Sequence, residues 1–135
     1  MTTVLFACVH NAGRSKMAEA FFNAAADPAR ARAISAGTRP AARMHAEVRE
    51  ALLEIGVTPP DSPPRLLDDA VARSVDLLVT MGCGEECPVI PGLARLDWSF
   101  ADPKGASREA VRAIRDQVRA HVLELVREKG WQRAS

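Results

Sequence analysis

Cys8, Arg14 and Ser15 are the residues best suited to chemistry in this sequence. They follow an apolar run that starts at Val4, and five residues separate the cysteine from the arginine. Backbone N–H groups of such a loop converge on a tetrahedral anion at the start of a helix, where the helix dipole favours negative charge. The arginine closes the cradle with a planar fork, and the same field stabilises a nucleophilic thiolate. The predicted oxyanion-binding loop comprises Cys8, Val9, His10, Asn11, Ala12, Gly13, Arg14 and Ser15.

A free cysteine at the end of a strand is also common as a small, buried hydrophobic residue. The surroundings of Cys8 decide between the two interpretations. An apolar strand precedes the loop, and a helix with apolar residues at helical spacing is expected from Ser15 to Ala26. A strand before and a helix after are the context that an anion-binding loop requires. We therefore favour the catalytic interpretation.

Two more thiols, Cys83 and Cys87, lie four residues apart after a second apolar run. On one helical turn they face the same way, at a separation that a disulfide spans after modest rearrangement. Gly82, Gly84 and Pro88 give this segment freedom and a boundary, as a redox loop needs. Two surface thiols without a joint role are the main alternative. A zinc site is less favoured, because no matching second pair of ligands is present.

Asp102 is the candidate general acid, although Asp-Pro on its own is an ordinary turn sequence. Asp97, which lies nearby in the sequence, competes for this role. The side chain of His10 is equally consistent with a solvent-facing and a catalytic position. Trp98 is equally consistent with a pocket wall and with core packing. His45 and His121 are expected in helices without partners.

The composition limits the remaining choices. The 135 residues fit one domain, 1–135, that is large enough to bury a core. Eighteen basic and seventeen acidic residues leave a formal charge of +1, so no nucleic-acid partner is expected. The sequence has no basic leader and no membrane-length apolar run, so no membrane partner and a cytoplasmic location are expected. In a reducing cytoplasm the three cysteines are more plausible as catalytic or redox groups than as structural ones.

Strands and helices alternate along the chain, which predicts an α/β sandwich with a mainly parallel sheet. The expected strands are Val4–Val9, Ala33–Thr38, Asp76–Met81 and Ala94–Asp97. The expected helices are Ser15–Ala26, His45–Ile55, Leu66–Ser74 and one from Ser107 to about Lys129. Ligands of such sheets bind beyond the carboxyl ends of the strands. Cys8, Cys83 and Asp102 all follow expected strands, so we expect them to meet at that edge.

These motifs resemble those of the low-molecular-weight phosphotyrosine phosphatase fold, and within it the arsenate reductases that use thioredoxin or a small thiol. The matching segments cover nearly the whole chain: 8–15, 35–38, 79–84, Cys87-Pro88, Trp98 and Asp102-Pro103. The resemblance implies a three-layer sandwich with a four-stranded parallel sheet flanked by helices. The loop is shared with the phosphatases, whereas Met81-Gly82-Cys83-Gly84 and Cys87-Pro88 are similar to the reductases.

The resemblance also implies residue roles in arsenate reduction and arsenic detoxification. Cys8 is the nucleophile, Arg14 the oxyanion clamp and Asp102 the proton donor. Ser15 bonds the thiolate and Asn11 holds the loop. Cys83 then attacks the arsenylated Cys8, and Cys87 passes the disulfide to the reductant.

No tightly bound cofactor is expected, and the external reductant is thioredoxin or a low-molecular-weight thiol such as mycothiol with its redoxin. The short interval between Cys83 and Cys87 leaves that reductant open. Some relatives hold a potassium ion near the loop through acidic and hydroxyl side chains, and Glu19 and Ser35 are candidates for part of that set here. Pro63-Pro64-Arg65 stands where further ligands are expected, so no metal is assigned. The alternative function is a phosphatase acting on protein tyrosine or small phosphoesters. Phosphatases of this fold usually have tyrosines after the Asp-Pro pair, whereas this chain contains no Tyr.

Overall fold

The computed structural model describes residues 1–82 and 89–133. Its elements, in chain order, are β1 (Thr2–Cys8), α1 (Arg14–Ala25), β2 (Ala31–Gly37), α2 (Ala46–Glu54), α3 (Asp69–Arg73), β3 (Leu77–Thr80), β4 (Ala94–Asp97) and α4 (Arg108–Glu128). The four strands form one parallel sheet in the order β2-β1-β3-β4. This arrangement confirms the expected α/β fold with a four-stranded parallel sheet.

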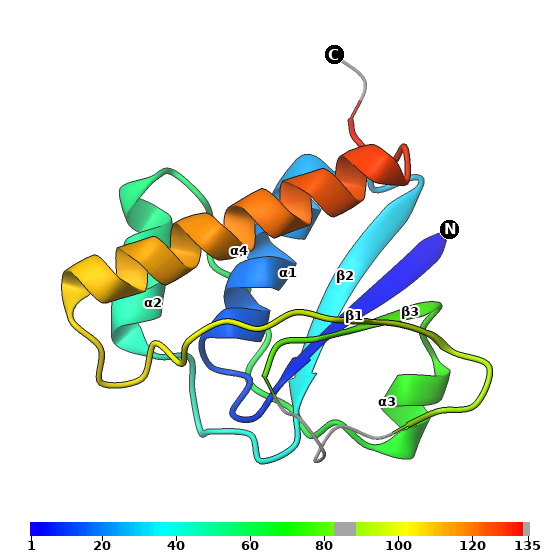
Figure 1. Ribbon diagram of the computed structural model, residues 1–135, viewed down its shortest axis with the longest axis horizontal. Helices are drawn as coiled ribbons and strands as arrows, with labels where there is room; N and C mark the ends of the chain where they lie inside the picture. The colour runs from blue at the N-terminus through cyan, green and yellow to red at the C-terminus, as the bar shows by residue number, and fades with distance from the viewer. Residues whose placement is uncertain (83–88, 134–135) are drawn as a thin grey trace.

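The sheet is covered on both faces, which makes three layers (Figure 1). Along β1, Val4 and Phe6 enter the large core beneath α1, α2 and α4, whereas Leu5 and Ala7 enter a smaller core that also contains Ala72 of α3. Successive side chains of a strand point to opposite faces, so a strand buried on both faces is apolar throughout. This explains why β1 and β3 are continuous apolar runs in the sequence.

Two helix starts are fixed by side-chain caps. The Ser107 hydroxyl accepts a hydrogen bond from the N–H of Ala110 at 3.1 Å, and α4 then runs past α2 and α1. The Asp68 carboxylate accepts from the N–H of Val71 at 2.8 Å at the start of α3. These caps satisfy N–H groups that have no partner inside the helix.

The predicted helix Leu66–Ser74 is wrong in its first part, because α3 begins only at Asp69. The chain before it is extended and pairs with the end of β2. Gly37 donates its N–H to the carbonyl of Arg65 at 2.9 Å, and Leu67 donates to the carbonyl of Gly37 at 2.8 Å. This pairing draws residues 65–67 against β2. The other helices and strands lie within a few residues of their predicted bounds.

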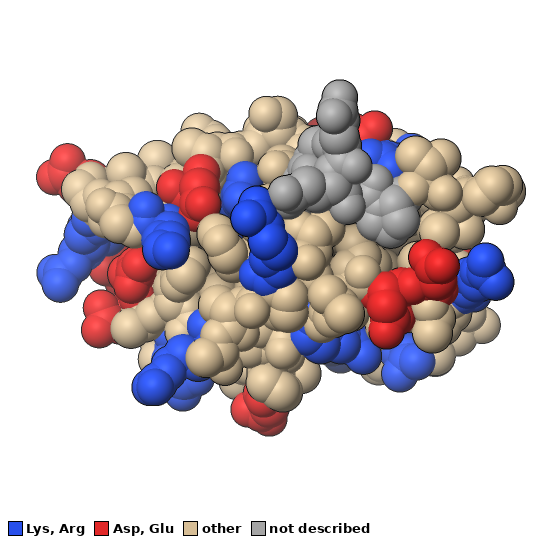
Figure 2. Space-filling view, turned by 90° about the horizontal axis from the view of Figure 1, so that it is seen from below, with Lys and Arg blue, Asp and Glu red and all other residues tan. Residues whose placement is uncertain are grey.

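No helix within the described ranges is long and apolar enough to cross a membrane. Figure 2, which views the molecule from below, shows basic and acidic side chains interspersed over that face. This distribution agrees with the near-neutral composition and provides no broad basic patch on the face shown.

Candidate active site

Residues 8–15, the oxyanion loop, connect β1 to α1, and their carbonyl groups are tied to the segment that follows β2. Within that segment, Thr38, Arg39, Ala41 and His45 donate backbone N–H groups to the carbonyls of Cys8, Val9, His10 and Ala12, at 3.2, 2.8, 2.9 and 2.9 Å. Because its carbonyls are held in this way, the loop presents its amides on the other side. Among the hydrogen bonds between described residues, no backbone N–H of residues 10–15 is a donor.

The loop ends at the N-terminus of α1, where Gly13 is the capping residue and provides no side-chain cap. Unpaired N–H groups at a helix start, together with the helix dipole, favour a bound anion. Asn11 has a left-handed backbone with φ of 51° and is fully buried. Asparagine tolerates this conformation better than most residues. The loop thus has the geometry of an oxyanion cradle.

The Cys8 thiol lies within this cradle and is 2% exposed. Its Sγ is 2.9 Å from the Ser15 hydroxyl, and the Asn11 Nδ2 donates to the same hydroxyl at 2.8 Å. Since an amide nitrogen only donates, the Ser15 oxygen accepts from Asn11 and its own proton is available to the sulfur. A hydrogen bond donated to sulfur favours the thiolate.

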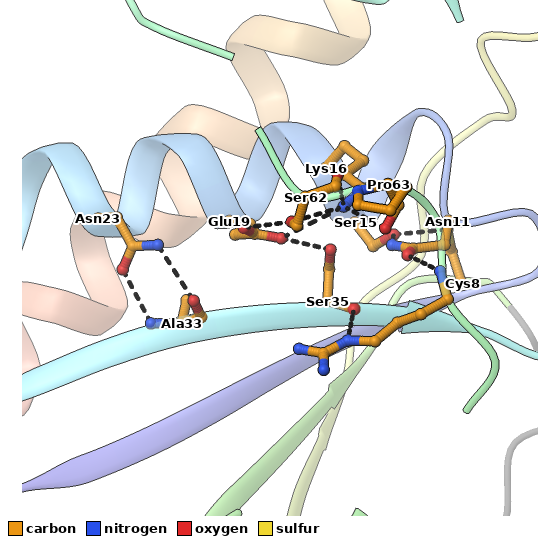
Figure 3. A network of polar contacts seen from close by, with 11 residues as sticks. Cys8, Asn11, Ser15, Lys16, Glu19, Asn23, Ala33, Ser35, Ser62 and Pro63 are labelled. Carbon is orange, nitrogen blue, oxygen red and sulfur yellow. Dashed lines mark hydrogen bonds and ion pairs between the residues drawn. The ribbon is translucent and has the colours of Figure 1, made fainter. Parts of the chain in front are cut away.

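The orientation of the Asn11 amide is fixed from outside the loop. Its Oδ1 accepts the backbone N–H of Arg65 at 3.0 Å, which leaves Nδ2 facing Ser15. Arg65 Nε donates in turn to the carbonyl of Ser35 at 3.2 Å. The segment before α3 therefore determines the direction of the hydrogen bonds that reach Cys8 (Figure 3).

Arg14 is 7% exposed and is held by the chain after β4. Its Nη1 donates to the carbonyl of Phe100 at 3.2 Å, and its Nη2 lies 3.9 Å from Asp102 Oδ2. Gly82 has φ of 104°, and a Cβ there would lie 2.3 Å from Arg14 Nη1. The residue immediately before Cys83 must therefore be small for the guanidinium to occupy its position.

Asp102 faces Arg14 but remains 44% exposed at its side chain. Its Oδ1 accepts the backbone N–H of Lys104 at 2.9 Å. The next residue, Pro103, packs on Gly13, where a Cβ would meet Pro103 Cγ at 2.7 Å. The Asp102-Pro103 turn thus lies directly on the oxyanion loop.

The competing carboxylate, Asp97, is engaged elsewhere. Its Oδ1 accepts hydrogen bonds from Thr80 Oγ1 at 2.5 Å and from Arg95 Nε at 2.7 Å. The bond from Thr80 and then that from Arg95 lower the pKa of Asp97 from its ordinary value. A carboxyl group that is held ionised is a poor proton donor.

Lys16 was not singled out by the sequence, yet it is 1% exposed and lies in a ring of oxygen atoms (Figure 3). Its Nζ donates to the Ser62 carbonyl at 2.8 Å and the Ser62 hydroxyl at 3.1 Å, and lies 3.4 Å from the Pro63 carbonyl. Glu19 Oε1 is 3.7 Å away and accepts from Ser35 Oγ at 2.5 Å. Glu19 and Ser35, the two residues considered for a potassium ion, are bonded to each other, and the Lys16 ammonium group is the cation that lies beside Glu19.

The aromatic and histidine residues mostly have packing roles. Trp98 packs at ring-centroid distances of 5.9 Å from Phe6 and 6.3 Å from Phe100. The expectation that His121 lacks a partner is wrong, because its ring packs edge to face against Trp98 and Phe100 and its Nδ1 lies 3.0 Å from the Gln117 carbonyl. His45 precedes α2, and its N–H holds the oxyanion loop. His10 is half-buried on the loop.

The structure brings Cys8, Arg14, Ser15 and Asp102 to one edge of the sheet. Cys83 and Cys87 lie outside the described residues, and so does the disulfide relay predicted for them. In the described part of the chain, no group of three or more His, Cys, Asp or Glu side chains is placed to hold a metal ion.

Comparison with known proteins gives consistent matches. A putative arsenate reductase of Halobacterium salinarum is 35% identical over 128 residues, which cover 89% of this chain and 87% of that protein. The structure of a thioredoxin-dependent arsenate reductase from Corynebacterium glutamicum superposes with a TM-score of 0.82 at 38% identity. The match covers 95% of this chain and 61% of that one, so this chain corresponds to only part of that protein. An arsenate reductase from Archaeoglobus fulgidus gives a TM-score of 0.79 at 35% identity, with 91% and 98% coverage.

The family model also matches almost the whole chain. It is described as low molecular weight phosphotyrosine protein phosphatase and matches residues 3–133. The oxyanion loop, the Asp102-Pro103 turn and, apart from Thr2, the four-stranded parallel sheet lie within this range. The chain therefore belongs to the low molecular weight phosphotyrosine protein phosphatase family.

Proposed function

We propose that this protein reduces arsenate to arsenite, with Cys8 as the nucleophile. The observation that carries the proposal is the position of the Cys8 Sγ, 2.9 Å from the Ser15 hydroxyl at the start of α1, in a loop whose carbonyls are bonded to the segment after β2. This position suits attack on a tetrahedral oxyanion. The relatives named arsenate reductases favour arsenate as that oxyanion.

In the first step the Cys8 thiolate attacks the arsenic atom of arsenate. A sulfur–arsenic bond forms and one arsenic–oxygen bond breaks. The departing hydroxyl group of arsenate takes one proton from Asp102 and leaves as water. Arg14 and the loop N–H groups bind the remaining oxygens, whose charge increases as the bond forms.

In the second step the Cys83 thiolate attacks the Cys8 sulfur. A disulfide forms, the sulfur–arsenic bond breaks, and its electron pair stays on arsenic. Arsenic(V) thereby becomes arsenic(III), while the two thiolates lose two electrons in total. Cys87 then attacks Cys83, which releases Cys8 and leaves a disulfide between the outer cysteines for the external reductant. Two thiols that are four residues apart in the sequence, the first directly after Gly82, favour this relay.

Thioredoxin is the favoured reductant because the Corynebacterium glutamicum structure is named thioredoxin-dependent. A low-molecular-weight thiol such as mycothiol, with its redoxin, is the alternative. In that case Cys8 passes arsenic to the external thiol, and the outer cysteines are not required.

The phosphatase activity that gives the family its name uses the same loop and a similar acid. A phosphatase receives a flat phenyl ester, which tyrosines near the acid turn help to hold. This chain has Lys104-Gly105 after Asp102-Pro103 and no tyrosine anywhere. We therefore rank phosphatase activity second.

The test measures arsenite formed from arsenate with thioredoxin and thioredoxin reductase as the only electron source. Parallel reactions use mycothiol with its redoxin, and a third measures p-nitrophenyl phosphate hydrolysis. We expect arsenite with one donor system and weak hydrolysis. Efficient hydrolysis without arsenite formation in either donor system would replace the proposal with phosphatase activity.

The relay has its own test, in which one equivalent of arsenate is added without reductant and the disulfides are identified by peptide mass spectrometry. Cys87→Ser should trap a disulfide between Cys8 and Cys83, whereas Cys83→Ser should prevent disulfide formation. A bond between Cys8 and Cys87 in the unmodified protein contradicts the order of attack. Full turnover with mycothiol when both outer cysteines are replaced contradicts the relay itself.

A further inference from the structure

The buried ammonium group of Lys16 has no part in the chemistry described so far. A charged amine with 1% exposure is costly unless its hydrogen bonds are satisfied. Here the cost is offset by the Ser62 carbonyl and hydroxyl, and by the Glu19 carboxylate at 3.7 Å. Burial lowers the pKa of Lys16 from its ordinary value, while the Glu19 carboxylate opposes that shift.

Lys16 is connected to the nucleophile through the residues that it binds, because these are close to Arg65 in the sequence. Ser62 and Pro63 precede Arg65 by three and two residues. The Arg65 N–H orients the Asn11 amide, which orients the Ser15 hydroxyl, which lies 2.9 Å from the Cys8 sulfur. Figure 3 shows Ser62 and Pro63 next to Lys16, with Ser15, Asn11 and Cys8 close by at the start of α1. A displacement of residues 62–65 would therefore move the Arg65 N–H away from Asn11. The hydrogen bonds from Asn11 to Ser15 and between Ser15 and Cys8 would then lose their fixed direction.

A second set of contacts closes the same network. Glu19 binds both Lys16 and the Ser35 hydroxyl, and the Ser35 carbonyl accepts from Arg65 Nε at 3.2 Å. Residues 62–65, which we call the strap, are thus bound at one end by α1 and at the other by β2 and Asn11. The strap itself is short, rich in proline and mostly exposed, so its own packing provides little support.

We propose that Lys16 is a positioning residue that holds the strap against α1 and thereby keeps Asn11 and Ser15 oriented toward Cys8. Lys16 touches neither the oxyanion nor the reacting sulfur in this role. The inference deepens the proposed function, because it explains how the loop of that function keeps its shape.

The test uses readouts that do not depend on arsenate reduction. The rate of Cys8 alkylation by iodoacetamide is followed against pH, with peptide mass spectrometry to separate Cys8 from the other thiols. Protection of Cys8 by inorganic phosphate measures oxyanion affinity. Lys16→Met keeps the aliphatic stem and removes the charge. Lys129→Met is the matched control, because Lys129 is an exposed lysine beyond α4.

In folded Lys16→Met, we expect the midpoint of alkylation to move upward by about one pH unit and phosphate protection to weaken about tenfold. Lys129→Met should match the unmodified protein in both measurements. An unchanged midpoint and unchanged protection in folded Lys16→Met would overturn the proposal. If oxyanion protection and alkylation behave as expected but no arsenite forms, the positioning role stands and the proposed function fails.

A second variant covers the case in which Lys16→Met does not fold. Lys16→Ala leaves space in the ring of oxygens, and ammonium chloride supplies the missing group in solution. Ammonium should restore part of the phosphate protection, whereas tetramethylammonium, which donates no hydrogen bond, should not. Equal recovery with both salts, or none with either, overturns the role of the ammonium hydrogen bonds.

Discussion

Two charged clusters in this protein use the same kinds of side chain in different surroundings. Beside the oxyanion loop, Lys16 is almost fully buried and is bound by Glu19 and the strap. Between α2 and α4, Glu54 accepts hydrogen bonds from Arg112 and Arg115, with its side chain 39% exposed. The first cluster is buried, and the strap and the hydrogen bonds of Arg65, Asn11 and Ser15 connect it to Cys8. The second remains hydrated, and among the described residues no hydrogen bond or ion pair joins its three side chains directly to the oxyanion loop.

The second cluster also borders a groove of about 350 Å³, lined in part by Glu47, Glu54 and Arg108. Its size does not make it a functional site, because Glu54 and Arg112, which both line the groove, already neutralise one another in a direct ion pair. Charges in water contribute little to stability and bind weakly. Under the proposal that Lys16 holds the strap, burial and a connection to the reacting sulfur are what distinguish the first cluster from the second.

The largest effect is expected at Cys8, where the first cluster acts. Cys8→Ser should abolish arsenate reduction, since a hydroxyl is far less ionised than a thiol at neutral pH and cannot form a disulfide. Arg14→Lys should reduce activity by roughly 10² or more, because a point charge does not reproduce the planar fork. Both are measured as arsenite formation, with circular dichroism to verify folding. More than trace turnover in folded Cys8→Ser contradicts the mechanism.

The next largest effect separates two carboxylates at the same edge of the sheet. Asp102→Asn should lower kcat by about 10² to 10⁴, the range for loss of a general acid, while phosphate binding persists. Asp97→Asn is the matched control and should be much milder, because Asp97 is bound by Thr80 and Arg95. Single-turnover kinetics measure both. A reversed order of effects would place the acid at Asp97.

The sequence predicts the elements that carry strong local patterns. The alternation of strands and helices indicates the sheet, and the spacing of Cys8 and Arg14 indicates the loop. Lys16 and the strap leave no comparable pattern, because a lysine in a helix is ordinarily on a solvated surface. Its burial depends on residues 62 and 63, which are 46 and 47 positions away along the chain. The extended residues before α3 were missed for the same reason, since their hydrogen bonds run to Gly37.

A smaller effect is expected at Gly82, whose backbone lies against Arg14. Gly82→Ala places a Cβ 2.3 Å from Arg14 Nη1, so we expect phosphate protection of Cys8 to weaken by roughly tenfold. Gly92→Ala is the control, because Gly92 also has a positive φ of 82° but no atom within 4 Å of the added Cβ. Backbone strain of about 1–2 kcal/mol is common to both variants. An equal loss of phosphate protection in Gly82→Ala and Gly92→Ala would show that backbone strain, and not the contact with Arg14, causes the loss.

The smallest effect is expected at Glu54, in the exposed cluster. Hydrogen bonds from Arg112 and Arg115 lower the pKa of Glu54 to about 2. Because this folded-state pKa lies below the ordinary value, the contribution of Glu54 to stability is complete above the ordinary value and is lost as the pH falls toward 2. Glu54→Gln should therefore lower Tm slightly at neutral pH, and the difference from the unmodified protein should shrink as the pH is lowered.

Thermal unfolding at several pH values, together with arsenite formation at neutral pH, tests this expectation. Glu54→Gln should leave activity unchanged, because no hydrogen bond or ion pair among the described residues joins the side chains of the cluster directly to the oxyanion loop. A Tm difference that grows on acidification would show that the carboxylate is destabilised in the folded protein, contrary to the effect of its two arginine partners. A loss of activity at unchanged stability would show that the α2–α4 cluster is coupled to Cys8, and the contrast between the two clusters would then fail.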